Sequence, residues 1–234
     1  TWKTTKATAD AVYSILLGGD NLLASTKLVE VSLGGNKVEP QNVEAGTGFY
    51  QQKFGRGEIK SALGQVQMTK HDAGVAWGSV HWQYLEDMSK VTPHTATPLR
   101  LAKEIYIRED EKTGQVLKPL NRDLKPGDEL VVRLVLRTDR DMEFVHMKDQ
   151  RGSGTEPVNV LSHYKYQDGL AYYESTRDAS SHFFIDYLPK GTYVFEYPVK
   201  VFHRGRYQTG IANIQSMYAP EFNSHSASHW LEVK

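Results

Sequence analysis

The sequence predicts a mainly β protein with two antiparallel β-sandwich-type modules and a short N-terminal helix. Apolar residues alternate with a period of two from Leu28 onward, and turn signals rich in Gly, Pro and Asp separate the alternating runs. Apolar stripes with a helical period of 3.6 are missing after residue 100. With 234 residues, of which 39% are hydrophobic, the chain is long enough to bury one or two cores.

The sequence pattern of residues 1–20 predicts a helix. Thr4 or Thr5 can cap its start, and the glycines Gly18 and Gly19 can end it. The apolar positions at helical spacing are Ala7, Ala11, Val12, Ile15 and Leu16. One short helix is not a domain, so we expect residues 1–20 to be the last helix of a preceding domain or a helix docked on a sheet.

Residues 21–92 predict a first, partial β-module. The stretch "KLVEVSLGGNKVEP" predicts two strands around a Gly-Gly-Asn turn, with Val29, Val31 and Leu33 on one face. The stretch "ALGQVQMTKHDAGVAWGSVHWQYLEDM" predicts two more strands around "HDAG". The second of these carries aromatic residues on both faces, which is typical of a well-covered strand, and we expect His81 to be partly buried in it.

Residues 93–234 predict the second sandwich. The polar segment from Ser89 to Arg100 contains two prolines and is the predicted linker. In "KPGDELVVRLVLR" a turn leads into a strand with Arg133 and Arg137 outside, and in "FFIDYLPKGTYVFEYPVKVF" we expect a hairpin at "PKG". The predicted inner faces are Leu130, Val132, Leu134 and Leu136 in the first strand, and Tyr193, Phe195, Tyr197, Val199 and Val201 in the second.

Composition excludes several kinds of function. The 28 basic and 28 acidic residues balance, so nothing favours a nucleic-acid partner or a membrane surface. No apolar run is long enough to span a membrane. The absence of cysteine excludes disulfides and thiol nucleophiles from this chain. The chain begins without an initiator Met, and we expect it to be a fragment of a longer protein.

Two residue clusters are candidates for chemistry. His225 and His229 would share a face if helical, but no acidic third ligand stands at a recognisable spacing, and ordinary surface or capping histidines fit as well. Glu174, Asp178 and His182 could supply an acid–base site, although a loop held by Arg–carboxylate pairing fits better. No nucleophile elbow, P-loop or dinucleotide motif occurs. We therefore predict no catalytic, cofactor or metal site, and a binding or structural role.

Several long strings carry a family resemblance. The strings "LVVRLVLRTDRDMEFVHMKDQR", "PVNVLSHYKYQDGLAYYESTRDASSHFFIDYLPKGTYVFEYPVKV" and "GIANIQSMYAPEFNSHS" resemble the C-terminal macroglobulin-like domain of bacterial α2-macroglobulin family proteins. Upstream, "TWKTTKATADAVYSILL" resembles the last helix of that family's thioester domain, and "AWGSVHWQYLEDMSKV" resembles the second part of its CUB domain. The resemblance thus implies three regions: residues 1–20, 21–92 and 93–234.

The resemblance implies the C-terminal end of a broad-spectrum endopeptidase inhibitor, not an enzyme, located in the periplasm or cell envelope. In this family a protease cuts a bait region, and a buried Cys–Gln thioester is then released to acylate the attacker. Neither part lies in this chain, so its implied partners are the thioester domain of the same protein and, through the full-length protein, target proteases. The alternative is a carbohydrate- or protein-binding β-sandwich, which would show an exposed strip of coplanar aromatic rings along a groove.

The resemblance also implies a role for Met217 and Tyr218. A thioester hydrolyses when water reaches it, so it needs an apolar cover until it is triggered. In bacterial relatives the last domain presses on the thioester domain, and the family's Met-Tyr string matches these two residues. We expect Met217 and Tyr218 to face the thioester domain, with Pro220 fixing the chain direction behind them. The alternative is that both are core residues of the final hairpin.

Overall fold

The computed structural model describes residues 4–18, 27–112 and 114–234. It is mainly β, as predicted, and the chain divides between Gln83 and Tyr84 into two compact units. This division lies before the boundary at residues 92–93 that we predicted from the resemblance. The assignment of residues 1–20 and 21–92 to thioester and CUB domains stays a prediction. None of the described helices has the length and apolar character needed to cross a membrane.

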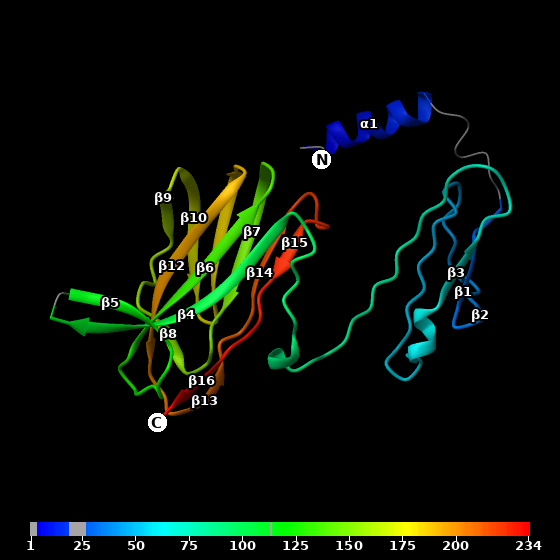
Figure 1. Cartoon of the computed structure of the whole chain (residues 1–234). Helices are drawn as coiled ribbons and strands as arrows, with labels where there is room; N and C mark the ends of the chain where they lie inside the picture. Colours follow the sequence, from blue (N-terminus) through cyan, green and yellow to red (C-terminus); the bar gives the residue numbers. More distant parts are fainter. Residues whose placement is uncertain (1–3, 19–26, 113) are drawn as a thin grey trace. The chain divides into compact units, whose positions relative to one another are not determined.

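The predicted N-terminal helix is α1, Thr5–Gly18 (Figure 1). The Thr4 hydroxyl accepts a hydrogen bond from the Ala7 backbone N–H at 3.1 Å, which is an N-cap contact. No side chain of α1 is buried, including the apolar Tyr13 and Leu17. Of the two glycines predicted to end the helix, Gly18 is the last residue of α1, and Gly19 lies outside the described residues.

The rest of the first unit is a small sheet with strand order β2-β1-β3. Its elements are β1 (Glu30–Leu33), β2 (Asn36–Lys37), the short 3-10 helix η1 (Ser61–Gly64) and β3 (Val66–Thr69). The predicted Gly-Gly turn joins β1 to β2, with φ of +58° at Gly34 and +82° at Gly35, which glycine adopts without strain.

Of the two strands predicted around "HDAG", the second, which carries the aromatic residues, is wrong. Residues 75–85 form no strand in the described chain, and the Trp77 side chain is 84% exposed. His81 is exposed as well, and its Nε2 lies 3.1 Å from the Ser79 hydroxyl. Period-two alternation specifies a strand only where a neighbouring strand accepts its hydrogen bonds. No described strand pairs with this segment.

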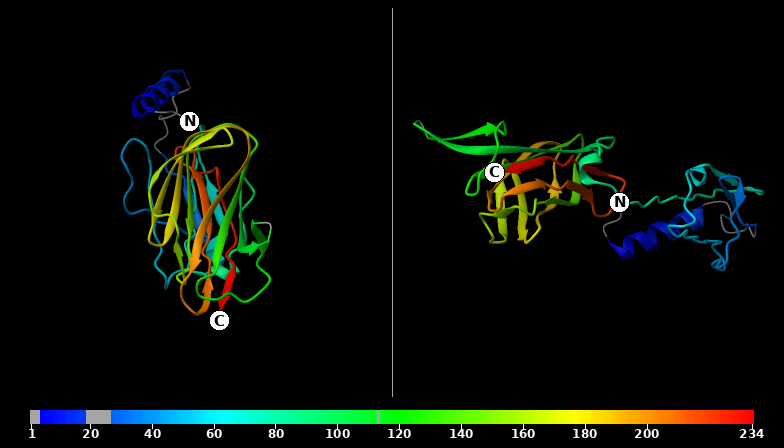
Figure 2. Two further views of the ribbon diagram at one scale, coloured as in Figure 1. Left: turned by 90° about the vertical axis from the view of Figure 1, so that its left-hand side faces the viewer. Right: turned by 90° about the horizontal axis from the view of Figure 1, so that it is seen from below.

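The second unit is a two-layer sandwich (Figure 1, Figure 2). One layer has the order β15-β14-β7-β11-β10-β9, the other has the order β5-β4-β6-β12-β8, and β13 pairs with β16. The strands are β4 (Leu99–Glu111), β5 (Gly114–Pro119), β6 (Glu129–Thr138), β7 (Met142–Gln150), β8 (Thr155–Pro157), β9 (His163–Gln167), β10 (Leu170–Arg177), β11 (Ser180–Leu188), β12 (Gly191–Val201), β13 (Gly205–Gln208), β14 (Ala212–Ser216), β15 (Asn223–His225) and β16 (Trp230–Val233).

The core lies between the two layers and follows the predicted alternation. All four predicted inner residues of β6 are buried, whereas Arg137 on the same strand is exposed. In β12 the predicted inner residues from Phe195 to Val201 are buried, and Tyr193 packs against them. The two inner faces therefore form one apolar core.

The predicted hairpin at "PKG" is wrong, although both of its strands exist. β11 pairs with β7 and β10 in the six-stranded layer, whereas β12 pairs with β6 and β8 in the other layer. Pro189 and Lys190 therefore carry the chain from one layer to the other. The sequence of a short turn does not tell whether the strands it joins pair with each other or face each other across a core.

The predicted linker is also packed rather than free. After the short 3-10 helix η2 (Met88–Lys90), the His94 backbone N–H donates to the His225 carbonyl at 3.0 Å. The Thr97 hydroxyl donates to the Asn223 carbonyl at 2.8 Å. Polar residues in this segment therefore form hydrogen bonds with backbone groups of β15.

Gly210 offers a stability test. Its φ is +76°, and a Cβ there would lie 2.6 Å from the Gln150 Cβ. We expect Gly210→Ala to lower the free energy of unfolding by roughly 2 kcal/mol or more, because left-handed strain and overpacking add. Gly114→Ala is the matched control, since Gly114 also has a positive φ but nothing within 4 Å of its Cβ position. Urea unfolding in which the two variants lose equal stability would contradict the crowding at Gly210.

Candidate functional site

Met217 and Tyr218 lie in the loop between β14 and β15. Side chains alternate along β14, so that Asn213 and Gln215 face outward, and Met217 continues this outward series. The Met217 side chain is 59% exposed and the Tyr218 side chain is 55% exposed. In this chain they are surface residues and not core residues of the final hairpin.

The loop is fixed by backbone hydrogen bonds on both sides. The Met217 N–H donates to the Phe144 carbonyl at 2.9 Å, and the Ser216 N–H donates to the Phe222 carbonyl at 3.0 Å. Ala219 is buried behind the exposed pair. The Pro220 carbonyl accepts from the Asn223 side-chain amide at 2.8 Å, so Pro220 takes part in closing the loop. The two exposed side chains therefore stand on an anchored backbone.

Phe144 on β7 supports Tyr218. The two rings meet edge to face, with centroids 5.3 Å apart and an interplanar angle of 83°. Phe144 has a φ of +52°, which is uncommon for a bulky residue and is found where surrounding structure holds a strained backbone. We define Phe144, Met217 and Tyr218 as the apolar loop surface.

A row of rings crosses the same outer face of the six-stranded layer. Tyr164, Tyr173, Phe184 and His146 occupy paired positions on β9, β10, β11 and β7. The Phe184 and His146 rings stack with centroids 4.7 Å apart, and Tyr164 is 76% exposed. The row is not coplanar, as the strip of a carbohydrate site would be, because the Tyr164 and Tyr173 rings meet at an interplanar angle of 62°.

His146, the last ring of this row, forms a pair with His182. His146 Nε2 and His182 Nδ1 are 3.0 Å apart, and the Ser180 hydroxyl lies 2.9 Å from His182 Nε2. Burial is the main cause that lowers the pKa of both histidines, and the neighbouring charges of Lys148 and, for His182, Arg177 lower it further. The folded pair therefore resists protonation.

This pair predicts a pH dependence of stability. The unfolded chain binds protons that the folded histidines reject, so the free energy of unfolding is highest above the ordinary His pKa of about 6.5 and falls as the pH drops through it. We expect the melting temperature to fall between about pH 7.5 and pH 5.5. The double variant His146→Gln/His182→Gln is the control, and a decline of the same size in this variant would exclude the pair as its cause.

The candidate acid–base residues do not converge. Ser175 stands opposite His182 across β10 and β11, so its neighbour Glu174 points to the opposite face of the sheet. Glu174 is buried and its Oε2 lies 2.5 Å from Lys165 Nζ. The turn between the strands is held by Arg151, whose guanidinium donates to the carbonyl oxygen of Asp178 at 2.8 Å. The predicted Arg–carboxylate pairing is thus an Arg–carbonyl contact, made by a residue outside the predicted cluster.

The candidate metal residues separate as well. His225 ends strand β15 and stacks on His94, with ring centroids 5.9 Å apart, whereas His229 Nε2 lies 3.1 Å from the Lys103 carbonyl oxygen. The chain between His225 and His229 is not helical, so the two side chains do not share a helix face. Within residues 4–18, 27–112 and 114–234, no group of three His, Asp or Glu side chains is placed to hold a metal ion.

Comparisons with known proteins identify one family and several solved structures of similar fold. The family model described as the bacterial alpha-2-macroglobulin MG10 domain matches residues 99–221, more than half of the chain. Escherichia coli alpha-2-macroglobulin activated by porcine elastase is 20% identical at a TM-score of 0.50, over 62% of this chain and 14% of that chain. Salmonella alpha-2-macroglobulin reacted with methylamine is 22% identical at a TM-score of 0.47, over 62% of this chain and 10% of that chain. No curated protein matches.

Proposed function

Because this chain belongs to the family of the bacterial alpha-2-macroglobulin MG10 domain, we propose that it is the C-terminal region of a broad-spectrum peptidase inhibitor. In that role it is a non-enzymatic part of a larger protein in the periplasm or cell envelope. Its partner is the thioester domain of the same protein, and it meets target proteases through the full-length molecule. The chain spans only 10% and 14% of the two solved relatives, in accord with a part that acts within a larger whole.

The apolar loop surface is the observation that carries the proposal. Met217 and Tyr218 are exposed although they are large and apolar, and their loop is anchored to β7 and β15. Exposed apolar groups on a rigid support suit a contact that must exclude water, because little conformational freedom is lost on docking. A thioester under such a contact is protected from hydrolysis until the domains separate.

The test is the lifetime of the thioester in the parent protein. We expect Met217→Ser/Tyr218→Gly to expose the bond, so that a free thiol appears in the absence of protease at least ~10-fold faster than in the wild type; a factor of 10 corresponds to only about 1.4 kcal/mol of lost shielding. Thiol titration against time measures the rate.

The matched control is Tyr164→Gly, because Tyr164 is exposed on the same face but stands on the far edge strand β9. A parent protein in which the loop double variant keeps its thiol masked as long as the wild type and the Tyr164 variant would refute the shielding role. Release of the thiol in both variants would point to general destabilisation of the domain instead.

A further inference from the structure

Two oppositely charged side chains meet in the core of the sandwich. Lys103 comes from β4 in one layer and Asp149 from β7 in the other. Their Nζ and Oδ1 atoms are 2.6 Å apart, and the side chains are 1% and 0% exposed. An amine and a carboxyl group are thus held in contact, away from water, across the two layers.

Burial shifts both groups toward their neutral forms. Desolvation is the main cause that lowers the pKa of Lys103 and raises the pKa of Asp149. A neutral amine is a nucleophile, and a protonated carboxyl group can lose its hydroxyl group as water. Burial therefore lowers the free-energy cost of reaching the two protonation states in which these groups can react with each other.

Tyr197 on β12 completes the site. Its hydroxyl donates a hydrogen bond to Asp149 Oδ2, the carboxyl oxygen that does not contact Lys103. A fixed donor at this oxygen stabilises the negative charge that develops there when a nucleophile attacks the carboxyl carbon.

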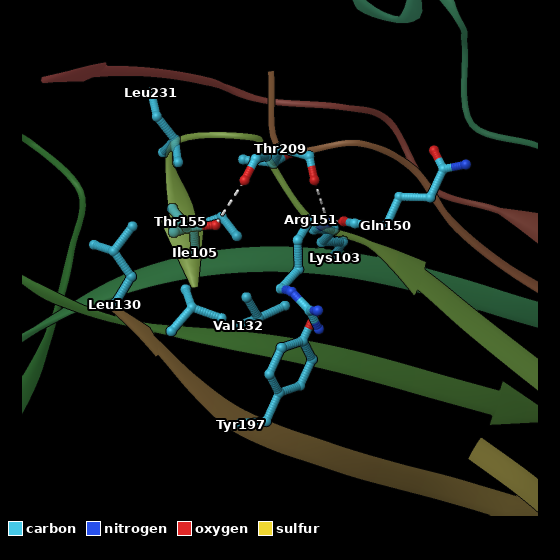
Figure 3. A pocket seen from close by; sticks show the side chains of 12 residues that line it. Lys103, Ile105, Leu130, Val132, Gln150, Arg151, Thr155, Tyr197, Thr209 and Leu231 are labelled. Carbon is cyan, nitrogen blue, oxygen red and sulfur yellow. Dashed lines mark hydrogen bonds between the residues drawn. The ribbon is translucent and has the colours of Figure 1, made fainter. Parts of the chain in front are cut away.

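A small cavity lies next to these groups (Figure 3). It is lined by Lys103, Tyr197 and Arg151 among others, and its volume of about 10 Å³ is close to the minimum for one water molecule. Arg151 Nε is buried and has no hydrogen-bond partner among the described residues. The cavity thus offers a leaving water both space and a donor.

We propose that Lys103 and Asp149 condense to an intramolecular isopeptide bond that joins the two layers. Lys103 Nζ attacks Asp149 Cγ, so that the N–C bond forms and the Cγ–Oδ1 bond breaks. Starting from ammonium and carboxylate, Oδ1 leaves as water with two of the three Nζ protons, and the third stays on the amide nitrogen. No oxidant, reductant or co-reactant is needed.

Two physical effects drive the reaction. Groups held in the right geometry react as if present at about 10⁵–10⁸ M. The buried ion pair carries the desolvation penalty of two charges, whereas the amide is neutral. Other contacts of Lys103 oppose the reaction because they stabilise its ammonium form. Its Nζ also donates to the carbonyl oxygens of Gln150 at 2.9 Å and Thr209 at 3.1 Å. These would hold the pair if it stayed ionic.

Mass spectrometry of the denatured chain decides between the bond and the ion pair. We expect an intact mass lower than the sequence mass by one water molecule, and a branched tryptic peptide joining Leu101–Arg108 to Asp149–Arg151. Lys103→Arg should restore the full sequence mass, and Tyr197→Phe should lower the linked fraction. The pair Lys165–Glu174 is the internal control, because Lys165 is 29% exposed and should stay unlinked. A wild-type chain at its full sequence mass with no branched peptide overturns the proposal, whatever the variants show.

Discussion

Replacing Asp149 with alanine is expected to lower the free energy of unfolding by at least about 3–5 kcal/mol, because it leaves the buried Lys103 amine with neither a covalent nor an ionic partner. Asp149 is fully buried and holds both the Lys103 ammonium and the Tyr197 hydroxyl. Its removal leaves a buried amine without its carboxylate partner and a buried hydroxyl without its acceptor. Urea unfolding followed by tryptophan fluorescence measures the loss.

Two further variants make this result specific. Lys103→Met/Asp149→Leu/Tyr197→Phe removes the buried amine, the carboxylate and the hydroxyl together and should recover the stability lost to unpaired polar groups. Asp139→Ala removes an exposed partner of Arg140 and should leave the unfolding midpoint unchanged. If Asp149→Ala unfolds at the wild-type urea concentration, the contact between Lys103 and Asp149 does not stabilise the core.

Phe183→Ala should have a comparable effect, about 3–5 kcal/mol, which is typical of a large aromatic residue removed from a packed core. Phe183 on β11 is 1% exposed, and its ring contacts Phe195 and Tyr197 of the opposite layer at centroid distances of 5.4 and 6.2 Å. The substitution opens a cavity between the two layers, where the surrounding strands cannot close it.

The neighbouring residue Phe184 is the matched control. It has the same side chain on the same strand but faces outward and is 42% exposed. Phe184→Ala should cost about 1 kcal/mol or less, mainly the loss of its stacking on His146. Equal losses in the two variants, measured by thermal and urea unfolding, would mean that the layers do not meet at Phe183.

The sequence predicted the strands of the second unit well, because their alternation reports directly which side faces a core. Val132 and Leu134 flank Arg133 in the sequence, and the structure buries Val132 and Leu134 but leaves Arg133 half-buried. Alternation does not report which strand lies next to which. The connection at Pro189 therefore looked like a hairpin, and residues 75–85 looked like a covered strand although no described strand pairs with them.

The candidate site was accessible to sequence reasoning only in part. Met217 and Tyr218 came from the family resemblance, and nothing in their local pattern distinguishes an exposed loop from a core hairpin. The charged pair in the core was missed, although it has a sequence signal. Lys103 occupies the inward register of Leu101 and Ile105, and Asp149 occupies that of Met147. A charged residue in each of two inward-facing stripes predicts that the two meet.

The bridge between the segment before β4 and strand β15 has a consequence for how the unit is made. The hydrogen bond from Thr97 to Asn223 joins residues 126 positions apart, so the segment before β4 reaches its partner strand β15 only after nearly the whole unit has been synthesised. Closing such long loops comes late and slows folding. Until β15 emerges from the ribosome, the segment before β4 lacks these hydrogen-bond partners, and a chain stalled before that point would be a natural client for a chaperone.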